Sequence, residues 1–211
     1  MNHIKTNDFQ EIVTGRRSIR YYDPSVKISR KEIKEILETA SLAPSSVNLQ
    51  PWRFLVIETP EGKETLAPLA GFNQSQVETS AAVIAVFADM NSSDYLDEIY
   101  GTAVKKGFMP EDVKNQQVKS IKGFFEVMTT DQLKEMNLID AGLVSMQLML
   151  AARAHGYDTN PIGGFEKAEI AQAFGLDKDR YYPVMLISIG KAANQGYQSV
   201  QLPVDQITEW R

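Results

Sequence analysis

Apolar residues recur at helical spacing in two long stretches of the chain, residues 30–42 and residues 130–156. The residues that share one helical face are Ile33, Ile36, Leu37 and Ala40 in the first stretch, and Leu143, Met146, Leu150 and Ala154 in the second. Ser29 and Glu32 form a capping box before the first stretch, and Gly156 is a typical stop for the second. Both stretches are therefore predicted to be amphipathic helices.

Three short apolar runs predict buried strands, at residues 53–59, 81–88 and 182–189. Their length and their β-branched residues favour strands over buried helices. Shorter helices are expected at residues 8–14, 60–69 and 166–174. Because helices separate the strands and no linker divides residues 1–211, the pattern predicts one domain with an α+β or α/β sandwich fold.

Two further segments have weaker patterns. Residues 92–128 are charged and helix-prone, with a helix start expected at Pro110. Residues 190–211 contain glycine and proline but little periodicity. We expect this C-terminal tail to wrap around a neighbour rather than to form a regular element.

Composition limits the chemistry and the partners. The net charge of −5 argues against nucleic-acid binding, which rests on many Lys and Arg contacts to phosphate. The absence of cysteine excludes disulfides, thiolate metal ligands and a Cys nucleophile, and is compatible with a cytoplasmic location. The polar residues 1–8 predict no signal peptide, and the run at 81–88 is too short to cross a membrane. With only His3 and His155 available, neither a metal site nor a Ser–His–Asp triad is expected.

A cluster of positive charge stands out in this acidic chain. Arg16, Arg17, Ser18 and Arg20 lie within five residues. In an extended segment, Arg16, Ser18 and Arg20 would point to one side. Arginine can pair with two phosphate oxygens at once, so this side would suit a phosphate monoester. The alternative is a solvated basic helix end that interacts with the helix dipole.

Two loops carry groups suited to a heteroaromatic ring. The first, residues 44–52, contains Ser45, Ser46, Asn48 and Gln50. Asn and Gln present a donor and an acceptor side by side, although the same residues are common in ordinary turns. The second loop is predicted at residues 161–165, where Gly163 and Gly164 would let a backbone N–H approach a ring. Its alternative is a tight turn before a helix.

No motif for side-chain catalysis or for dinucleotide phosphates accompanies these groups. The sequence contains neither G-x-G-x-x-G nor G-x-x-x-x-G-K-[ST]. Carboxylates are plentiful, but no pair stands out as a general acid and base. The chain thus offers binding groups without an evident catalytic side chain, which is typical of proteins whose cofactor performs the chemistry.

Taken in order, these segments resemble the FMN-dependent nitroreductase family over nearly the whole chain. They are Arg-Arg-Ser-Ile-Arg, Ala-Pro-Ser-Ser-Val-Asn-Leu-Gln-Pro-Trp, Asn73 before the 81–88 strand, Pro-Ile-Gly-Gly-Phe, and Leu-Pro-Val-Asp in the tail. The resemblance implies an α+β fold in which helices cover a mostly antiparallel sheet. It also implies a homodimer with FMN at the interface, in which the C-terminal tail is exchanged and adds a strand to the partner's sheet.

The resemblance further implies which residues contact FMN. Those expected to hold the phosphate and the pyrimidine side of the flavin are Arg16, Arg17, Ser18 and Arg20. Those expected to reach it from the other subunit are Ser45, Ser46, Asn48 and Gln50. Asn73 would hydrogen-bond the ring. Those expected to lie against the ring are Pro161, Ile162, Gly163 and Gly164, with the N–H of Gly163 or Gly164 near flavin N5.

The activity implied is NAD(P)H-dependent reduction of nitroaromatics, quinones or similar molecules by ping-pong hydride transfer, with residues 92–128 as a lid. Other flavin reactions on the same fold, such as enone or flavin reduction or dehalogenation, and a non-catalytic FMN-binding module are the alternatives. Gln201 stands where many members carry a basic phosphate ligand, and a lost charged contact costs about 1.5–3 kcal/mol. Gly163 stands where an acidic residue is common, which leaves substrate preference open.

Overall fold

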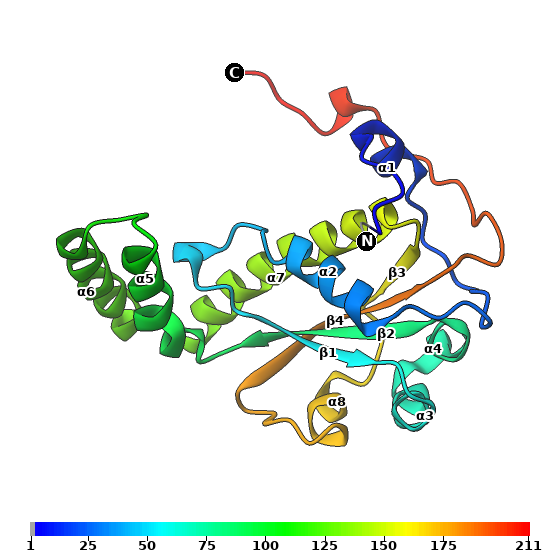
Figure 1. Ribbon diagram of the computed structural model, residues 1–211, viewed down its shortest axis with the longest axis horizontal. Coiled ribbons are helices and arrows are strands. Elements are labelled where there is room, and N and C mark those ends of the chain that lie inside the picture. The colour runs from blue at the N-terminus through cyan, green and yellow to red at the C-terminus, as the bar shows by residue number, and fades with distance from the viewer. Residues whose placement is uncertain (1–2) are drawn as a thin grey trace.

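A four-stranded sheet forms the centre of the computed structural model, which describes residues 3–211 (Figure 1). The strands are β1 (Trp52–Ile57), β2 (Ala82–Asp89), β3 (Asp158–Ile162) and β4 (Tyr181–Gly190). Their order is β1-β2-β4-β3, and every neighbouring pair is antiparallel. The fold is therefore α+β, and the three strands predicted from apolar runs are confirmed.

Helices cover both faces of the sheet, α2 and α7 on one face and α3, α4 and α8 on the other (Figure 1). The helices are α1 (Phe9–Gly15), α2 (Arg30–Ala40), α3 (Pro60–Leu66), α4 (Gln74–Thr79), α5 (Leu96–Lys105), α6 (Glu111–Val127), α7 (Thr130–Ala154) and α8 (Lys167–Ala173). The predicted helices are confirmed to within a few residues at their ends. Helix α4 was not predicted, because its six residues are too few for a periodic pattern.

Strand β2 is buried on both sides, which explains its continuous apolar run. Ile84 and Val86 pack into the core that contains residues of α2 and α7. Val83 and Phe87 pack into the opposite core, beneath α3 and α8. Since successive side chains of a strand point to opposite faces, one apolar strand serves both cores.

Helix α7 is apolar on two sides. A capping box of Thr129 and Gln132 starts it, and residues such as Val144 and Leu148 are buried against the sheet. The apolar face seen in the sequence points elsewhere, since Leu143 is 43% exposed and Met146 is 41% exposed. The chain therefore leaves an apolar surface of its longest helix uncovered.

The two edges of the sheet differ. The loop predicted at residues 161–165 is wrong at its first two positions, because Pro161 and Ile162 belong to β3 and pair with β4. Proline is tolerated there because β3 is an edge strand. Ser18 forms a bridge with Thr159 along its outer side. Along the outer side of β1, no residue within 3–211 forms a strand or a bridge.

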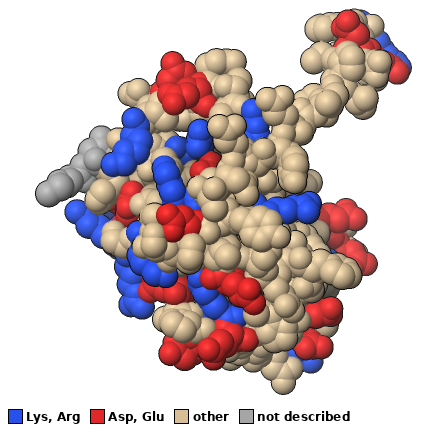
Figure 2. Space-filling view, turned by 90° about the vertical axis from the view of Figure 1, so that its right-hand side faces the viewer, with Lys and Arg blue, Asp and Glu red and all other residues tan. Residues whose placement is uncertain are grey.

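Two parts extend from this body. Residues 92–128 contain a 3-10 turn, α5 and α6, which lie beside each other at one end of the sheet (Figure 1). The tail after β4 runs away from the body as an arm that is plain in Figure 2. Val200 is 99% exposed and Trp210 is 84% exposed, so the arm packs little against its own chain. None of the helices within residues 3–211 is long and apolar enough to cross a membrane.

Candidate functional site

The Arg16–Arg20 segment is extended and directs its side chains into two different hollows. Ser18 and Arg20 line a hollow of about 340 Å³ together with Tyr21 and tail residues 194–197. Arg17 lines another, of about 450 Å³. Its guanidinium donates to the backbone oxygens of Thr14 at 2.6 Å and Arg16 at 2.9 Å. The structure thus groups Ser18 with Arg20 and turns Arg17 to the other side.

Buried neighbours fix this segment in place. Ile19 is almost fully buried, and its N–H donates to the carbonyl oxygen of Thr159 at 3.2 Å. The hydroxyl of Tyr22 lies 2.8 Å from the Ser188 hydroxyl, and burial raises the pKa of Tyr22 well above its usual value. With anchors on both sides of Arg20, the exposed Ser18 and Arg20 have a fixed backbone from which to reach a ligand.

A chain of side-chain amides ties Asn73 to β3. Asn73 ends the 3-10 segment Ala67–Asn73, and its amide nitrogen donates to the Gly164 carbonyl oxygen at 3.0 Å. Gln76 donates to the Asn73 amide oxygen at 3.0 Å, and the Asn160 amide nitrogen donates to Gln76 in turn. The structure therefore brings Asn73 and the glycine turn together, as expected of one site.

The glycine turn itself is open. Neither Gly163 nor Gly164 has a positive φ, so the backbone does not require glycine at these positions. No atom would lie within 4 Å of a Cβ added to either residue. A flat ligand could approach this backbone closely, and a side chain here would obstruct it.

Residues 45–50 form a second site fragment, around the 3-10 turn η1 (Ser46–Asn48). Asp140 of α7 accepts hydrogen bonds from the Ser46 N–H at 3.0 Å and its hydroxyl at 3.3 Å. Burial raises the pKa of Asp140, while these bonds from Ser46 oppose that rise. The Ser45 hydroxyl accepts from the Gln50 N–H at 2.9 Å. Both serines thus use their side chains to shape the loop.

The two fragments do not meet within one chain. The 45–50 loop follows α2 and extends toward α5, and the Tyr100 hydroxyl of α5 donates to the Val47 carbonyl oxygen at 3.2 Å (Figure 1). Ser18 and Gly164 lie instead beside the two ends of β3. No hydrogen bond or ion pair among residues 3–211 joins Asn48 or Gln50 to Ser18, Asn73 or Gly164.

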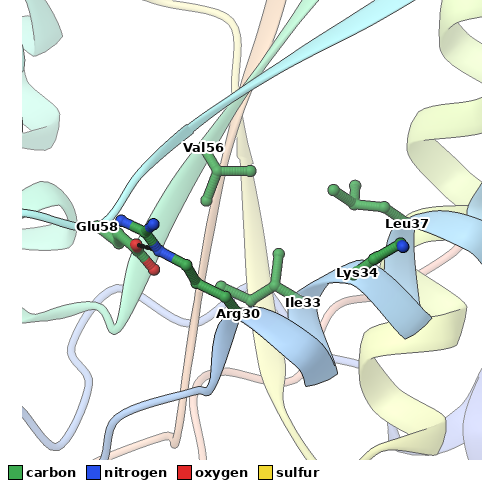
Figure 3. Close-up of a pocket in the computed structure, with 6 residues that line it drawn as sticks. All are labelled: Arg30, Ile33, Lys34, Leu37, Val56 and Glu58. Atoms are coloured by element: carbon green, nitrogen blue, oxygen red, sulfur yellow. Dashed lines mark hydrogen bonds and ion pairs between the residues drawn. The ribbon is translucent and has the colours of Figure 1, made fainter.

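A different hollow, of about 280 Å³, lies between α2 and β1 (Figure 3). Ile33, Leu37 and Val56 give it an apolar wall, and Arg30 forms an ion pair with Glu58 at one end. None of the site residues predicted from the sequence lines it. This hollow lies along the outer edge of the sheet at β1 instead.

Several residues that organise the site were missed from the sequence. Gln76 and Asn160 are buried amides that lie among other polar residues in the sequence, so no local signal singled them out. Asp89, which is fully buried, forms an ion pair with Arg53 at 3.0 Å and accepts hydrogen bonds from two nitrogens of Arg180 at 2.9 and 3.1 Å. An acidic residue that ends a wholly apolar strand was a signal for such a partner. No cluster of His, Asp and Glu suited to a metal ion occurs in the described part of the chain.

The sequence profile of the nitroreductase family matches residues 13–191. The chain belongs to this family. The family assignment makes it an oxidoreductase and confirms the resemblance found in the sequence. A Bacillus subtilis relative named "Putative NAD(P)H nitroreductase YdgI" is 67% identical over 208 residues, which cover 99% of this chain and 100% of the relative.

Other nitroreductase-family members extend the comparison. The crystal structure of a nitroreductase from Exiguobacterium sibiricum in complex with FMN is 65% identical, covers 98% of each chain and superposes with a TM-score of 0.96. A Lactiplantibacillus plantarum relative, named CLA biosynthesis enone reductase, is 36% identical over 92% of this chain and 90% of its own. Solved and curated relatives therefore match this nitroreductase-family chain along almost its whole length.

Proposed function

We propose that this chain binds FMN and transfers electrons from NADH or NADPH to electron-poor small molecules such as nitroaromatics and quinones. The observation that carries the proposal is the FMN complex of the 65% identical Exiguobacterium sibiricum nitroreductase, whose fold agrees with this one at a TM-score of 0.96. The 67% identical Bacillus subtilis relative, with NAD(P)H in its name, supports the electron donor.

The chemistry of the donor set fits FMN. Ser18 and the exposed Arg20 share one hollow, and a hydroxyl with a guanidinium suits the phosphate or a ring oxygen. Asn73 is held beside Gly164, where an amide can meet the polar edge of the flavin. Arg16 lines neither of the two hollows, and we propose that it adds its positive charge to this region from the start of the segment. Arg17, which lines the opposite hollow, contributes its charge without a direct contact.

FMN, once bound, supplies the hydride chemistry. The protein holds and orients it, and the N–H groups of Gly163 and Gly164 are open to donate a hydrogen bond to the ring. The coenzyme and the oxidant use one place in turn, in agreement with the lack of a separate dinucleotide motif. The helices α5 and α6 within residues 92–128 serve as the lid that excludes water from this place.

The active form is a homodimer. One chain keeps the 45–50 loop apart from Ser18 and Gly164, so a second copy supplies the loop to each site. The exposed apolar surface of α7 and the exposed arm ending in Trp210 provide the contact area, with the tail, residues 190–211, reaching the partner. Deleting residues 200–211 is expected to shift the protein toward monomers in sedimentation velocity and to lower FMN content. If the truncated protein stays dimeric, the tail does not hold the dimer together.

The first test is the absorption spectrum of the purified protein, recorded before and after adding NADH without air. Flavin bands that bleach would establish an FMN oxidoreductase. A protein that takes up no FMN would contradict the proposal, and one that takes up FMN without bleaching would support a binding module. The cytoplasmic location suggested by the absence of cysteine stays a prediction.

Enone reduction is a second candidate, favoured by the 36% identical Lactiplantibacillus plantarum enone reductase. The open glycine turn, with no side chain at residues 163 and 164, sets no evident chemical preference. A panel of nitroaromatics, quinones and conjugated enones, compared by kcat/KM with the same NADH concentration, separates the two. A higher value for enones would replace the nitro and quinone substrates proposed above.

A further inference from the structure

The backbone of the 45–50 loop adopts a conformation that some of its residue types disfavour. Val47 has φ 44°, Asn48 has φ 56° and Gln50 has φ 49°, all in the left-handed region. Asparagine tolerates this region, but a β-branched residue such as valine is a clear outlier there. Such strain persists only where surrounding contacts impose it, and it is common at functional sites.

Contacts from the α5–α6 pair impose this conformation. The Tyr100 hydroxyl of α5 donates to the carbonyl oxygen of Val47 itself, at 3.2 Å. Leu49, the next residue but one, is only 2% exposed and packs into a small core with Tyr100 and the α6 residues Val118 and Ile121. The strained turn is therefore fastened to these helices by one hydrogen bond and one buried side chain.

A third contact closes the loop from its other end. The Arg53 guanidinium donates to the Gln50 carbonyl oxygen at 3.0 Å and lies over the Tyr95 ring, 4.5 Å from its centroid. The same guanidinium pairs with the buried Asp89. Through Arg53, the loop is thus held between Tyr95, which directly precedes α5, and Asp89, which ends β2.

We propose that Tyr100 is a positioning residue, which holds Val47 in its left-handed conformation and so keeps the 45–50 loop in the shape that binds FMN. The inference rests on the proposed function, because the role of this loop in FMN binding comes from there. The proposed role of Tyr100 couples the lid helices α5 and α6 to the 45–50 loop, because a displacement of α5 removes the contacts that maintain the strained turn.

The test compares Tyr100→Phe with a matched control. The Tyr157 hydroxyl also makes one hydrogen bond, to Glu32 at 3.0 Å, so Tyr157→Phe removes an equivalent group far from the loop. Loss of one hydrogen bond is expected to weaken FMN binding of Y100F about fivefold, measured by fluorescence titration of the apoprotein. Y157F should bind FMN like the parent. An equal loss of FMN affinity in Y100F and Y157F would indicate general destabilisation rather than a role of Tyr100 in the loop.

A rescue variant shows whether the strained turn is the cause. Glycine adopts a positive φ without cost, so Val47→Gly removes the need for the Tyr100 contact. The Y100F substitution should weaken FMN binding about fivefold in the parent and less than about twofold in the V47G background. An unchanged effect of Y100F in V47G would overturn the role assigned to Tyr100.

Hydrogen exchange of the apoprotein provides a readout that does not depend on FMN. Amides of residues 45–50 should exchange faster in Y100F, with those of β2 unchanged. If the parent binds no FMN, the proposed function fails, and this exchange pattern still reports whether Tyr100 holds the loop. If the parent binds FMN and Y100F matches it in affinity and exchange, the inference alone is wrong.

Discussion

Asn73 donates a 3.0 Å hydrogen bond to the carbonyl oxygen of Gly164, a residue 91 positions further along the chain. Its amide oxygen is occupied by Gln76, which fixes the orientation of the amide group. The end of the 3-10 segment and the turn after β3 are thereby joined on one side of the sheet. Loss of the Asn73 N–H donor is expected to disturb both the 3-10 segment and the turn after β3.

Asn73→Asp tests this junction. Aspartate still accepts from Gln76 but has no hydrogen to donate, and its charge faces the Gly164 carbonyl oxygen. We expect FMN affinity to fall about tenfold, as for the loss of a hydrogen bond within a polar network. Asn115→Asp, on an exposed position of α6, adds the same charge elsewhere. Equal affinities of N73D and N115D would contradict the role of Asn73.

Arg20→Ala tests the phosphate side of the site. Removal of a charge-assisted hydrogen bond costs about 1.5–3 kcal/mol, so the Kd for FMN should rise at least about tenfold. The control is Arg30→Ala, because Arg30 is an exposed arginine that pairs with Glu58 outside the site. If fluorescence titration gives R20A and R30A the same Kd, Arg20 does not contact the cofactor.

Asp89→Ala tests the buried ion-pair cluster. Asp89 is fully buried between Arg53 and Arg180, and its removal takes one anionic partner from each guanidinium group. Because both guanidinium groups are partly exposed and keep other partners, we expect the free energy of unfolding in urea to fall by about 1.5–3 kcal/mol. Asp97 of α5 pairs with Lys122 of α6 on the exposed surface, and D97A should leave the unfolding midpoint unchanged. A D89A protein as stable as D97A would rule out a structural role for this cluster.

Asp140 gives a pH-dependent prediction. Burial raises its pKa in the folded state above the unfolded value, so the folded protein binds the proton more tightly. The stability linked to this proton is present at low pH and is lost as pH rises through the folded pKa. Asp140→Asn should therefore gain stability relative to the parent as pH increases from about 4 to 7. Parallel stability curves for parent and D140N would show that Asp140 does not titrate in this range.

The elements that the sequence predicted well are those in which local pattern and burial agree. Strand β2 is apolar at nearly every position because both of its faces are buried, so its run was visible without a partner. Helix α2 has its capping residue Ser29 and a regular apolar face. In both cases, local propensity and tertiary environment favour the same structure.

The predictions failed where distant residues decide the outcome. Pro161 suggested a loop, and only its place at the sheet edge allows it within β3. Leu143 and Met146 mark the apolar face seen in the sequence, yet Val144 and Leu148 are the residues buried against the sheet. Periodicity reveals an apolar face but does not say what covers it.

The site was recognisable in parts. The residue types at Arg20 and Gly164 suggested binding, and the family resemblance supplied Asn73 and the order of these segments along the chain. The left-handed turn at Val47 and its contact with Tyr100 had no sequence signal, because valine disfavours that conformation. A strained turn depends on contacts that only the folded chain supplies.

The unequal edges of the sheet decide how copies of this chain can associate. On β3, Pro161 lacks an N–H and Ser18 already occupies the outer side, so this edge offers little to a new strand. The outer side of β1 has neither feature among the described residues. We therefore expect strand addition at the β1 edge only, and a copy joined there would present no equivalent edge on its other side. Such a sheet favours a closed pair and resists growth into fibrils.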